Sequence, residues 1–175
     1  MTENHPERWP YDIFRVLVDH RVRQVAYVPD AGHARLIDLC SDSNEMIPVP
    51  LTTEEEGVAL LAGAWLGGER GVLLMQSSGV GNCINMLSLT RTCRMPLLML
   101  VTMRGEWGEF NPWQVPMGQN TNKSLTLAGV VTFPVDDEAR VKGTVEAAAR
   151  MSFEGSTATA VLISQSILGA KAFGK

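Results

Sequence analysis

The sequence lacks the features by which composition alone assigns a protein to a membrane, secreted or nucleic-acid-binding class. No stretch approaches the ~20 apolar residues of a membrane-spanning helix. The beginning, MTENHPERWPYDIF, is polar where a secretory signal would be basic and then apolar. Lysines and arginines are scattered and the net charge is -4, which argues against a nucleic-acid surface. We therefore expect a cytoplasmic protein with no membrane and no nucleic-acid partner.

Cysteine is scarce as well. The three cysteines, Cys40, Cys83 and Cys93, are odd in number and match neither a zinc ribbon nor a CxxC pair. We expect free and mostly buried thiols in a reducing compartment. At 175 residues, the chain is long enough to bury roughly 70% of its unfolded surface, so it needs no disulfide to fold.

Helical and strand-like patterns alternate along almost the whole sequence. Helices are expected over 10–22, 34–40, 54–67, 82–92 and 136–153, with a short one near Leu125. Strands are expected over 24–28, 46–50, 71–76, 96–102, 130–135 and 158–164. This alternation predicts one α/β domain over 1–175, with a mostly parallel six-stranded sheet and helices on both faces. The prolines of 46–50 suit an edge strand.

Ligands of such sheets bind at the carboxyl ends of the strands. The turns to inspect are therefore 29–33, 51–54, 76–82 and 102–122. Residues 103–122 hold two tryptophans and show no clear period. We expect a long loop there, and loops of that length are often functional.

The segment TTEEEG, residues 52–57, places three glutamates where a predicted strand ends and a predicted helix begins. Thr53 and Glu56 have the spacing of a capping box, and acids in a first turn interact favourably with the helix dipole. That accounts for Glu55 and Glu56. Glu54 lies at the strand-to-helix junction, where it is either one more helix-start acid or, if sheltered, a carboxyl that exchanges a proton with a ligand.

The segment QSSGVGNCIN, residues 76–85, predicts a strand that runs into Gly79 and Gly81 before a helix. Backbone N–H groups in such turns receive an anion or a polar ring. It contains no GK[ST], so it is not a Walker loop. The alternative is a tight turn that needs glycine only for its backbone angles.

Together these segments resemble the pyrimidine-binding domain of thiamine-diphosphate-dependent decarboxylases. The resemblance lies in TTEEEGVALLAGAWLGGERGVLLMQSSGVGN, with VPDAGH upstream and MPLLMLVTMRGEWGE and QVPMG downstream, and it spans residues 10–165. Within the family the sequence is most similar to alpha subunits of sulfopyruvate decarboxylases, with phosphonopyruvate decarboxylases as near relatives. The resemblance implies conversion of sulfopyruvate to sulfoacetaldehyde and CO2.

The resemblance also implies how thiamine diphosphate is bound. Counting back nine residues from Gly63 gives Glu54, which corresponds to the glutamate that contacts the aminopyrimidine ring and exchanges a proton with it. The cofactor-binding residues implied in this way are Glu54, Gln76, Ser77, Ser78 and Gly79.

For the substrate, the resemblance implies contacts from Asp30, His33, Gln76 and Arg104. His33, in the turn PDAGH, is either a catalytic proton shuttle or a surface histidine. Gln76 is expected to hydrogen-bond substrate or cofactor. Arg104 pairs either with a sulfonate or phosphonate, which its guanidinium fork matches, or with Glu106 or Glu109 of its own loop.

Members of the family hold the diphosphate through Mg2+, using a second domain with GDG and NN motifs. This sequence contains no GDG. The resemblance therefore implies a hetero-oligomer in which a beta subunit carries GDG, NN and the magnesium, and no metal site in this chain. Met86, Leu87, Trp107 and Trp113 are expected either to contact that subunit or to lie in the core.

Two alternatives stay open. The substrate is phosphonopyruvate or another 2-oxo acid if the segment WGEFNPWQ changes the specificity. The other belongs to a different class: a nucleotide-binding or scaffold module with the same doubly wound sheet and no catalysis.

Overall fold

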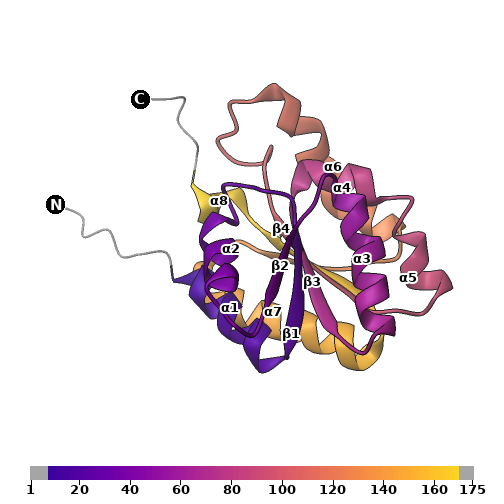
Figure 1. Ribbon diagram of the computed structural model, residues 1–175. Coiled ribbons are helices and arrows are strands. Elements are labelled where there is room, and N and C mark those ends of the chain that lie inside the picture. Colours follow the sequence, from indigo (N-terminus) through magenta and orange to yellow (C-terminus); the bar gives the residue numbers. More distant parts are fainter. Residues whose placement is uncertain (1–7, 170–175) are drawn as a thin grey trace.

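The computed structural model describes residues 8–169, in which six strands form one sheet between two layers of helices (Figure 1). The strands are β1 (Val22–Tyr27), β2 (Ile47–Pro50), β3 (Arg70–Gln76), β4 (Leu97–Thr102), β5 (Val131–Val135) and β6 (Ala158–Ile163). The helices are α1 (Trp9–Asp19), α2 (Ala34–Ser41), α3 (Glu54–Leu66), α4 (Ser77–Cys83), α5 (Ser88–Thr92), α6 (Val115–Leu127), α7 (Glu138–Gly155) and α8 (Gln165–Leu168), and a short 3-10 helix, η1, spans Pro112–Gln114.

The strand order is β2-β1-β3-β4-β6-β5, and every neighbouring pair is parallel. The predicted α/β class and the six-stranded sheet are confirmed. Strand β2 lies at an edge, as its prolines predict. Strands β4 and β6 are buried along their whole length, as expected for apolar strands covered on both faces.

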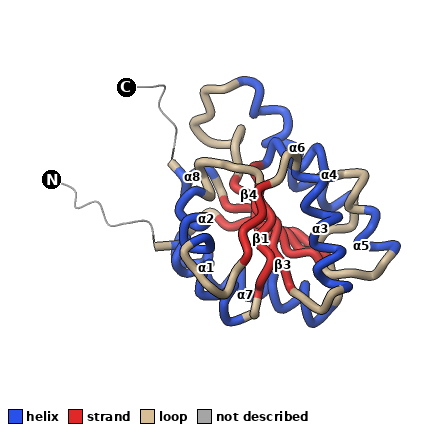
Figure 2. The backbone as a smooth tube through the Cα atoms, viewed as in Figure 1, coloured by secondary structure: helices blue, strands red, loops and turns tan. Residues whose placement is uncertain are grey.

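Each face of the sheet has its own hydrophobic core. Helices α1, α2 and α7 cover one face, and α3, α4 and α6 cover the other (Figures 1 and 2). Along β3, Val72 and Leu74 face the first core while Leu73 and Met75 face the second. This period of two shows why a run of apolar residues is needed where both faces are covered.

Two segments differ from the sequence-based expectation. Residues 76–82 are not a glycine turn, because α4 begins at Ser77 directly after β3, and neither Gly79 nor Gly81 has a positive φ. The single helix expected over 82–92 is replaced by α4 and α5. Residues 115–122, expected as loop, form the first part of α6, whose buried positions are Gly118, Thr121 and Leu125. Small and polar buried residues hide such helices from a hydrophobic pattern.

The start of α3 separates the three glutamates. The Glu56 carboxylate accepts hydrogen bonds from the backbone N–H groups of Thr52 (2.8 Å) and Thr53 (3.4 Å), so the capping box is confirmed. Glu55 is exposed, whereas Glu54 is buried. One acid therefore caps the helix, one faces solvent and one faces inward.

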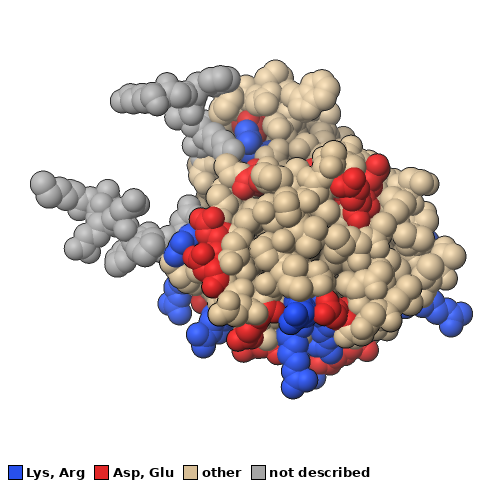
Figure 3. Space-filling model, viewed as in Figure 1, with Lys and Arg blue, Asp and Glu red and all other residues tan. Residues whose placement is uncertain are grey.

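Beyond its first turn, where Glu55 and Glu56 are exposed, the outer side of α3 is apolar. Ala59 and Gly63 are exposed, Leu66 is 87% exposed, and no other side chain comes within 4 Å of a Cβ placed on Gly63. In Figure 3 a wide uncharged area occupies the middle of this face, and the charged residues lie mostly around its margins. A helix that is apolar on all sides is typical of one covered by another element.

The three cysteines are free thiols, Cys40 and Cys83 buried and Cys93 exposed. Burial raises the pKa of both Cys40 and Cys83 to about 12, which keeps these thiols protonated and unreactive. Between residues 8 and 169, no helix combines the length and apolar character that crossing a membrane requires.

The capping box makes a stability prediction. Glu56→Ala is expected to lower the free energy of unfolding by about 1 kcal/mol, because two backbone N–H groups lose their acceptor. Urea unfolding at neutral pH measures it. Glu55→Ala, which removes a first-turn charge without a cap, is the control and should cost under about 0.5 kcal/mol. Equal losses in the two variants would contradict the assignment.

Candidate functional site

The predicted site residues gather at the carboxyl edge of the sheet, where β1, β3 and β4 end. Asp30 and His33 follow β1, Gln76 ends β3, and Arg104 follows β4. Glu54 begins α3, and Ser77, Ser78 and Gly79 form the first turn of α4. Parallel strands end at one edge, so residues far apart in the sequence become neighbours there.

Glu54 is 9% exposed and has one hydrogen-bond donor, the Asn82 amide, whose Nδ2 lies 2.8 Å from Oε2. Within residues 8–169 no donor is bonded to Oε1. A Cβ on Gly79 would lie 2.2 Å from that oxygen. Gly79 therefore serves the close approach of α4 to the carboxylate, and the tight-turn interpretation of this glycine is wrong.

Asp30 is the centre of a second cluster. Its Oδ1 accepts from Gln76 Nε2 (2.9 Å), and its Oδ2 accepts from Thr102 Oγ1 (2.7 Å) and the Gly32 N–H (3.1 Å). The Ser78 hydroxyl donates to Gln76 Oε1 at 3.0 Å. Ser78 precedes Gly79, the residue whose backbone lies against the Glu54 carboxylate. The structure therefore places the hydrogen-bonded cluster of Asp30, Gln76 and Ser78 next to Glu54, with no hydrogen bond between the cluster and Glu54 among the described residues.

His33 lies beneath this edge. It is fully buried, so the surface-histidine interpretation is wrong. Its Nε2 is 3.0 Å from the carbonyl oxygen of Leu100, which can only accept, so Nε2 carries the hydrogen. In the part of the chain that the structure describes, Nδ1 has no hydrogen-bond partner. Burial holds the pKa of His33 below 6.5, opposed in part by the nearby Asp30 carboxylate, and the ring is therefore neutral at neutral pH.

Arg104 is also buried, with 8% exposure. Its Nε and Nη2 donate to Glu109 at 2.6 and 2.7 Å, so it pairs with Glu109 of its own loop and not with Glu106. The Arg104 guanidinium lowers the pKa of Glu109 to about 2. Between residues 8 and 169, Nη1 of Arg104 is bonded to no other group. Ser77, fully buried, accepts from the Arg104 N–H at 3.0 Å.

Two openings border the site. A cavity of about 80 Å³ is lined by Asp30, Ala31, Gly32, Thr102, Arg104, Leu168 and Gly169. A wider groove of about 770 Å³ runs from Ser78 to Trp113 and Met117. Trp113 is 82% exposed and Trp107 is 53% exposed, Met86 is half-buried, and Leu87 is fully buried. Of the two alternatives for Leu87, partner contact or core, the structure therefore shows the core.

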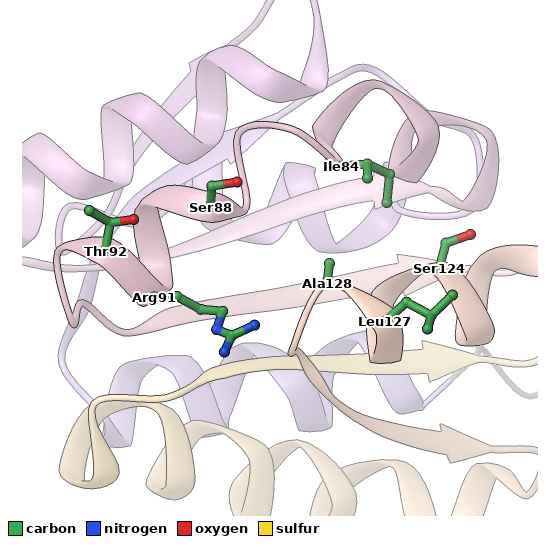
Figure 4. A pocket seen from close by; sticks show the side chains of 7 residues that line it. All are labelled: Ile84, Ser88, Arg91, Thr92, Ser124, Leu127 and Ala128. Atoms are coloured by element: carbon green, nitrogen blue, oxygen red, sulfur yellow. The ribbon is translucent and has the colours of Figure 1, made fainter.

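A separate cavity of about 580 Å³ lies between α5 and the end of α6. In Figure 4 the Arg91 side chain extends from α5 into the gap beside Ala128, and Leu127 and Ser124 border it from α6. None of the predicted site residues lines this cavity. It is therefore distinct from the site at the sheet edge.

The sequence pattern missed three residues that hold the site together: Asn82, Thr102 and Gln165. Two had a usable signal. Asn82 follows Gly79 by three residues, which places both on one side of a helix, but a turn was expected there. Thr102 ends β4 directly beside Gln76, the last residue of β3.

Comparison with known proteins gives the following similarities. Residues 11–116 match the model for the thiamine pyrophosphate enzyme, N-terminal TPP binding domain. The chain is 32% identical over 152 residues to the sulfopyruvate decarboxylase subunit alpha of Methanococcus maripaludis, covering 86% of this chain and 91% of that one. It is 37% identical over 120 residues to the sulfopyruvate decarboxylase of Methanosarcina acetivorans, covering 68% of this chain and 31% of that one.

A third relative is the phosphonopyruvate decarboxylase of Streptomyces viridochromogenes, 34% identical over 143 residues, which cover 81% of this chain and 36% of that one. Among solved structures, 2-oxoglutarate:ferredoxin oxidoreductase from Magnetococcus marinus superposes with a TM-score of 0.75 at 13% identity, covering 91% of this chain and 29% of that chain. At that identity the likeness shows a shared fold.

Burial of His33 makes a pH prediction. With the pKa of His33 below 6.5 in the folded chain, the unfolded chain binds the extra proton as the pH falls from about 7 to 5. The free energy of unfolding is expected to fall over that range and to be unaffected by His33 above it. Urea unfolding between about pH 5 and 8 should show a flatter slope in His33→Gln. An unchanged slope in His33→Gln would contradict the prediction.

Proposed function

Because this chain belongs to the family of thiamine pyrophosphate enzymes, we propose that it is the alpha subunit of a decarboxylase that converts sulfopyruvate to sulfoacetaldehyde and CO2. The observation that carries the proposal is the Glu54 carboxylate. It is buried at the carboxyl edge of the sheet, and one of its two oxygens has no donor among the described residues.

The residues around Glu54 fit the pyrimidine half of thiamine diphosphate. A ring nitrogen that gains and loses a proton needs a carboxyl that can donate and accept. Asn82 engages Oε2, so Oε1 is the atom on which an exchangeable proton would reside. Gly79 keeps a side chain away from that oxygen. When bound, the cofactor supplies the thiazolium that takes up the electrons of the broken carbon–carbon bond.

The remaining residues of the site act in binding and orientation. We assign Gln76, Ser78 and Gly79 to the cofactor's surroundings, because their network ends beside Glu54. Ser77 acts indirectly, by holding the start of α4 against the Arg104 backbone.

On the substrate side, Gln76 and Asp30 are held together by a hydrogen bond. His33 belongs to the same turn, since its N–H donates to the Asp30 carbonyl at 3.1 Å. Because the ring is buried and neutral, we assign His33 to support of this turn and of Asp30 in preference to proton shuttling.

The substrate's oxyanion is assigned to the cavity beside Arg104. Glu109 occupies one edge of the guanidinium, and the Nη1 edge stays available for a sulfonate. Asp30 lines the same cavity, and its two carboxylate oxygens are engaged by three neutral hydrogen-bond donors. A phosphonate suits the same chemistry, and the similarity to a phosphonopyruvate decarboxylase favours that acid as the second candidate. Comparing CO2 release from the two acids decides between them.

We further propose that a beta subunit with GDG and NN motifs supplies the Mg2+ and diphosphate half of the site, in a cytoplasmic hetero-oligomer. Support comes from the similarity to the Methanococcus maripaludis protein, which is a subunit alpha. The alignment with this chain covers 91% of the length of that subunit. The apolar outer side of α3 and the exposed Trp113 offer surface for that contact.

The proton role of Glu54 is tested in the reconstituted complex. Glu54→Gln keeps the size and the hydrogen-bonding shape but cannot exchange a proton, so CO2 release is expected to fall at least ~100-fold. Glu55→Gln, one residue away and exposed, should retain the rate. A rate within a few-fold of the unsubstituted complex would instead favour the nucleotide-binding or scaffold alternative.

The partner contact is tested by Trp113→Ser, which is expected to weaken binding to the beta subunit by roughly 10-fold or more. Leu127→Ser is a matched control, because Leu127 is 86% exposed and Trp113 82%, and Leu127 lies in the α5–α6 cavity away from the site. Binding is measured by calorimetry. Equal affinities for both variants, or full decarboxylation by this chain alone, would contradict the proposed contact.

A further inference from the structure

Gln165 is a buried polar residue that lies, in the sequence, outside residues 11–116, which match the family model. It begins α8, directly after β6, and is 1% exposed. Its Oε1 accepts from the backbone N–H groups of Glu106 and Trp107, both at 3.2 Å, and its Nε2 donates to Glu109 at 3.0 Å. All three bonds go to the loop that follows Arg104.

The loop after Arg104 also accepts hydrogen bonds from the segment around Gln165. Glu106 Oε1 accepts from the Gln165 N–H at 2.9 Å and from the Ser164 hydroxyl at 2.8 Å. Five hydrogen bonds therefore join the turn between β6 and α8 to residues 106–109. Such reciprocal bonding, part-buried in four of the five cases, holds both segments in one arrangement.

Glu109 connects this junction to Arg104. The same Glu109 Oε2 that accepts from Gln165 also accepts from Arg104 Nε at 2.6 Å. Arg104 lines the cavity of about 80 Å³, and so does Leu168, at the other end of the short helix that Gln165 begins. Gln165 therefore ties together two parts of the wall of one cavity.

We propose that Gln165 is a positioning residue that sets the affinity for the substrate's oxyanion, by holding Arg104 and α8 in fixed relation around this cavity. The inference rests on the proposed function, because it takes the oxyanion to bind at Arg104. The Gln165 amide supplies the acceptor and the donor from one side chain, which neither leucine nor an ionised glutamate does. Leucine would leave the Glu106 and Trp107 N–H groups without a partner, and glutamate would place a second carboxylate beside Glu109.

The test uses the complex of this chain with its beta subunit, carrying Gln165→Leu, Gln165→Glu or the control Ser166→Ala. Ser166 is the exposed next residue, and its hydroxyl contacts only Ser164 among the described residues. Sulfopyruvate is titrated by calorimetry into complex prepared without thiamine diphosphate, where it is not consumed. With the cofactor present, kcat and KM are measured from CO2 release.

Both Gln165 variants are expected to raise Kd and KM by about 10-fold, with kcat changed less than about 3-fold, because the loss concerns binding and not the proton transfer at Glu54. In Gln165→Leu the amide hydrogens of Glu106 and Trp107 should also exchange faster. Ser166→Ala should leave Kd, KM and exchange unchanged.

Unchanged Kd and KM in Gln165→Leu, despite faster exchange, would overturn the proposal, as would a fall in kcat at constant KM or an equal effect of Ser166→Ala. Failure of the unsubstituted complex to release CO2 would overturn the proposed function alone, since the Kd values of the variants still judge the role of Gln165.

Discussion

The approach of helix α4 to the Glu54 carboxylate is the constraint on which the site depends. A Cβ on Gly79 would lie 2.2 Å from Oε1, so the helix can sit there only because this residue has no side chain. The helix begins one residue after β3 ends, which brings Gln76 and Ser78 to the same edge. Val80 and Cys83 of α4 are fully buried, and this packing keeps the first turn of α4 in place.

The buried carboxylates of this edge differ in how completely they are hydrogen-bonded. Glu109 accepts from five donors: two on Arg104, the N–H groups of Gly105 and Asn111, and the Gln165 amide. Within residues 8–169, Glu54 accepts from one donor. A carboxylate that is saturated with donors is held ionised and in place, as the low pKa of Glu109 shows. A carboxylate with a free oxygen is available to a ligand, and this contrast is why we propose a chemical role for Glu54 and a structural one for Glu109.

The sequence pattern predicts well what depends on periodicity and local spacing. The six strands, the edge position of β2 and the capping box at Thr53 all follow from residues within a few positions of one another. Helices α4 and α6 did not follow, because glycines and polar residues occupy their buried positions. The glycines at these positions are small because the helices pack closely against Glu54 and Arg104. These contacts join distant parts of the sequence, so no local pattern predicts them.

For the site too, the features that depend on local position were predicted and those that depend on long-range contacts were not. Position at the strand ends selected Glu54, Asp30 and Gln76, and the structure places them together. The burial of His33 could not be predicted from the sequence pattern, since its side chain contacts the Leu100 carbonyl, 67 residues away. The role of Gln165 depends on a loop 56 to 59 residues earlier in the chain. Contacts of this kind arise only when the sheet has brought the segments together.

We propose that Oε1 of Glu54 is the atom that contacts the cofactor's pyrimidine ring. A crystal structure of the reconstituted complex with thiamine diphosphate tests this contact. We expect a pyrimidine ring nitrogen within about 3.2 Å of Oε1, with Asn82 still bonded to Oε2. A pyrimidine ring bound away from Glu54, or an Oε1 bonded to the protein instead, would contradict it.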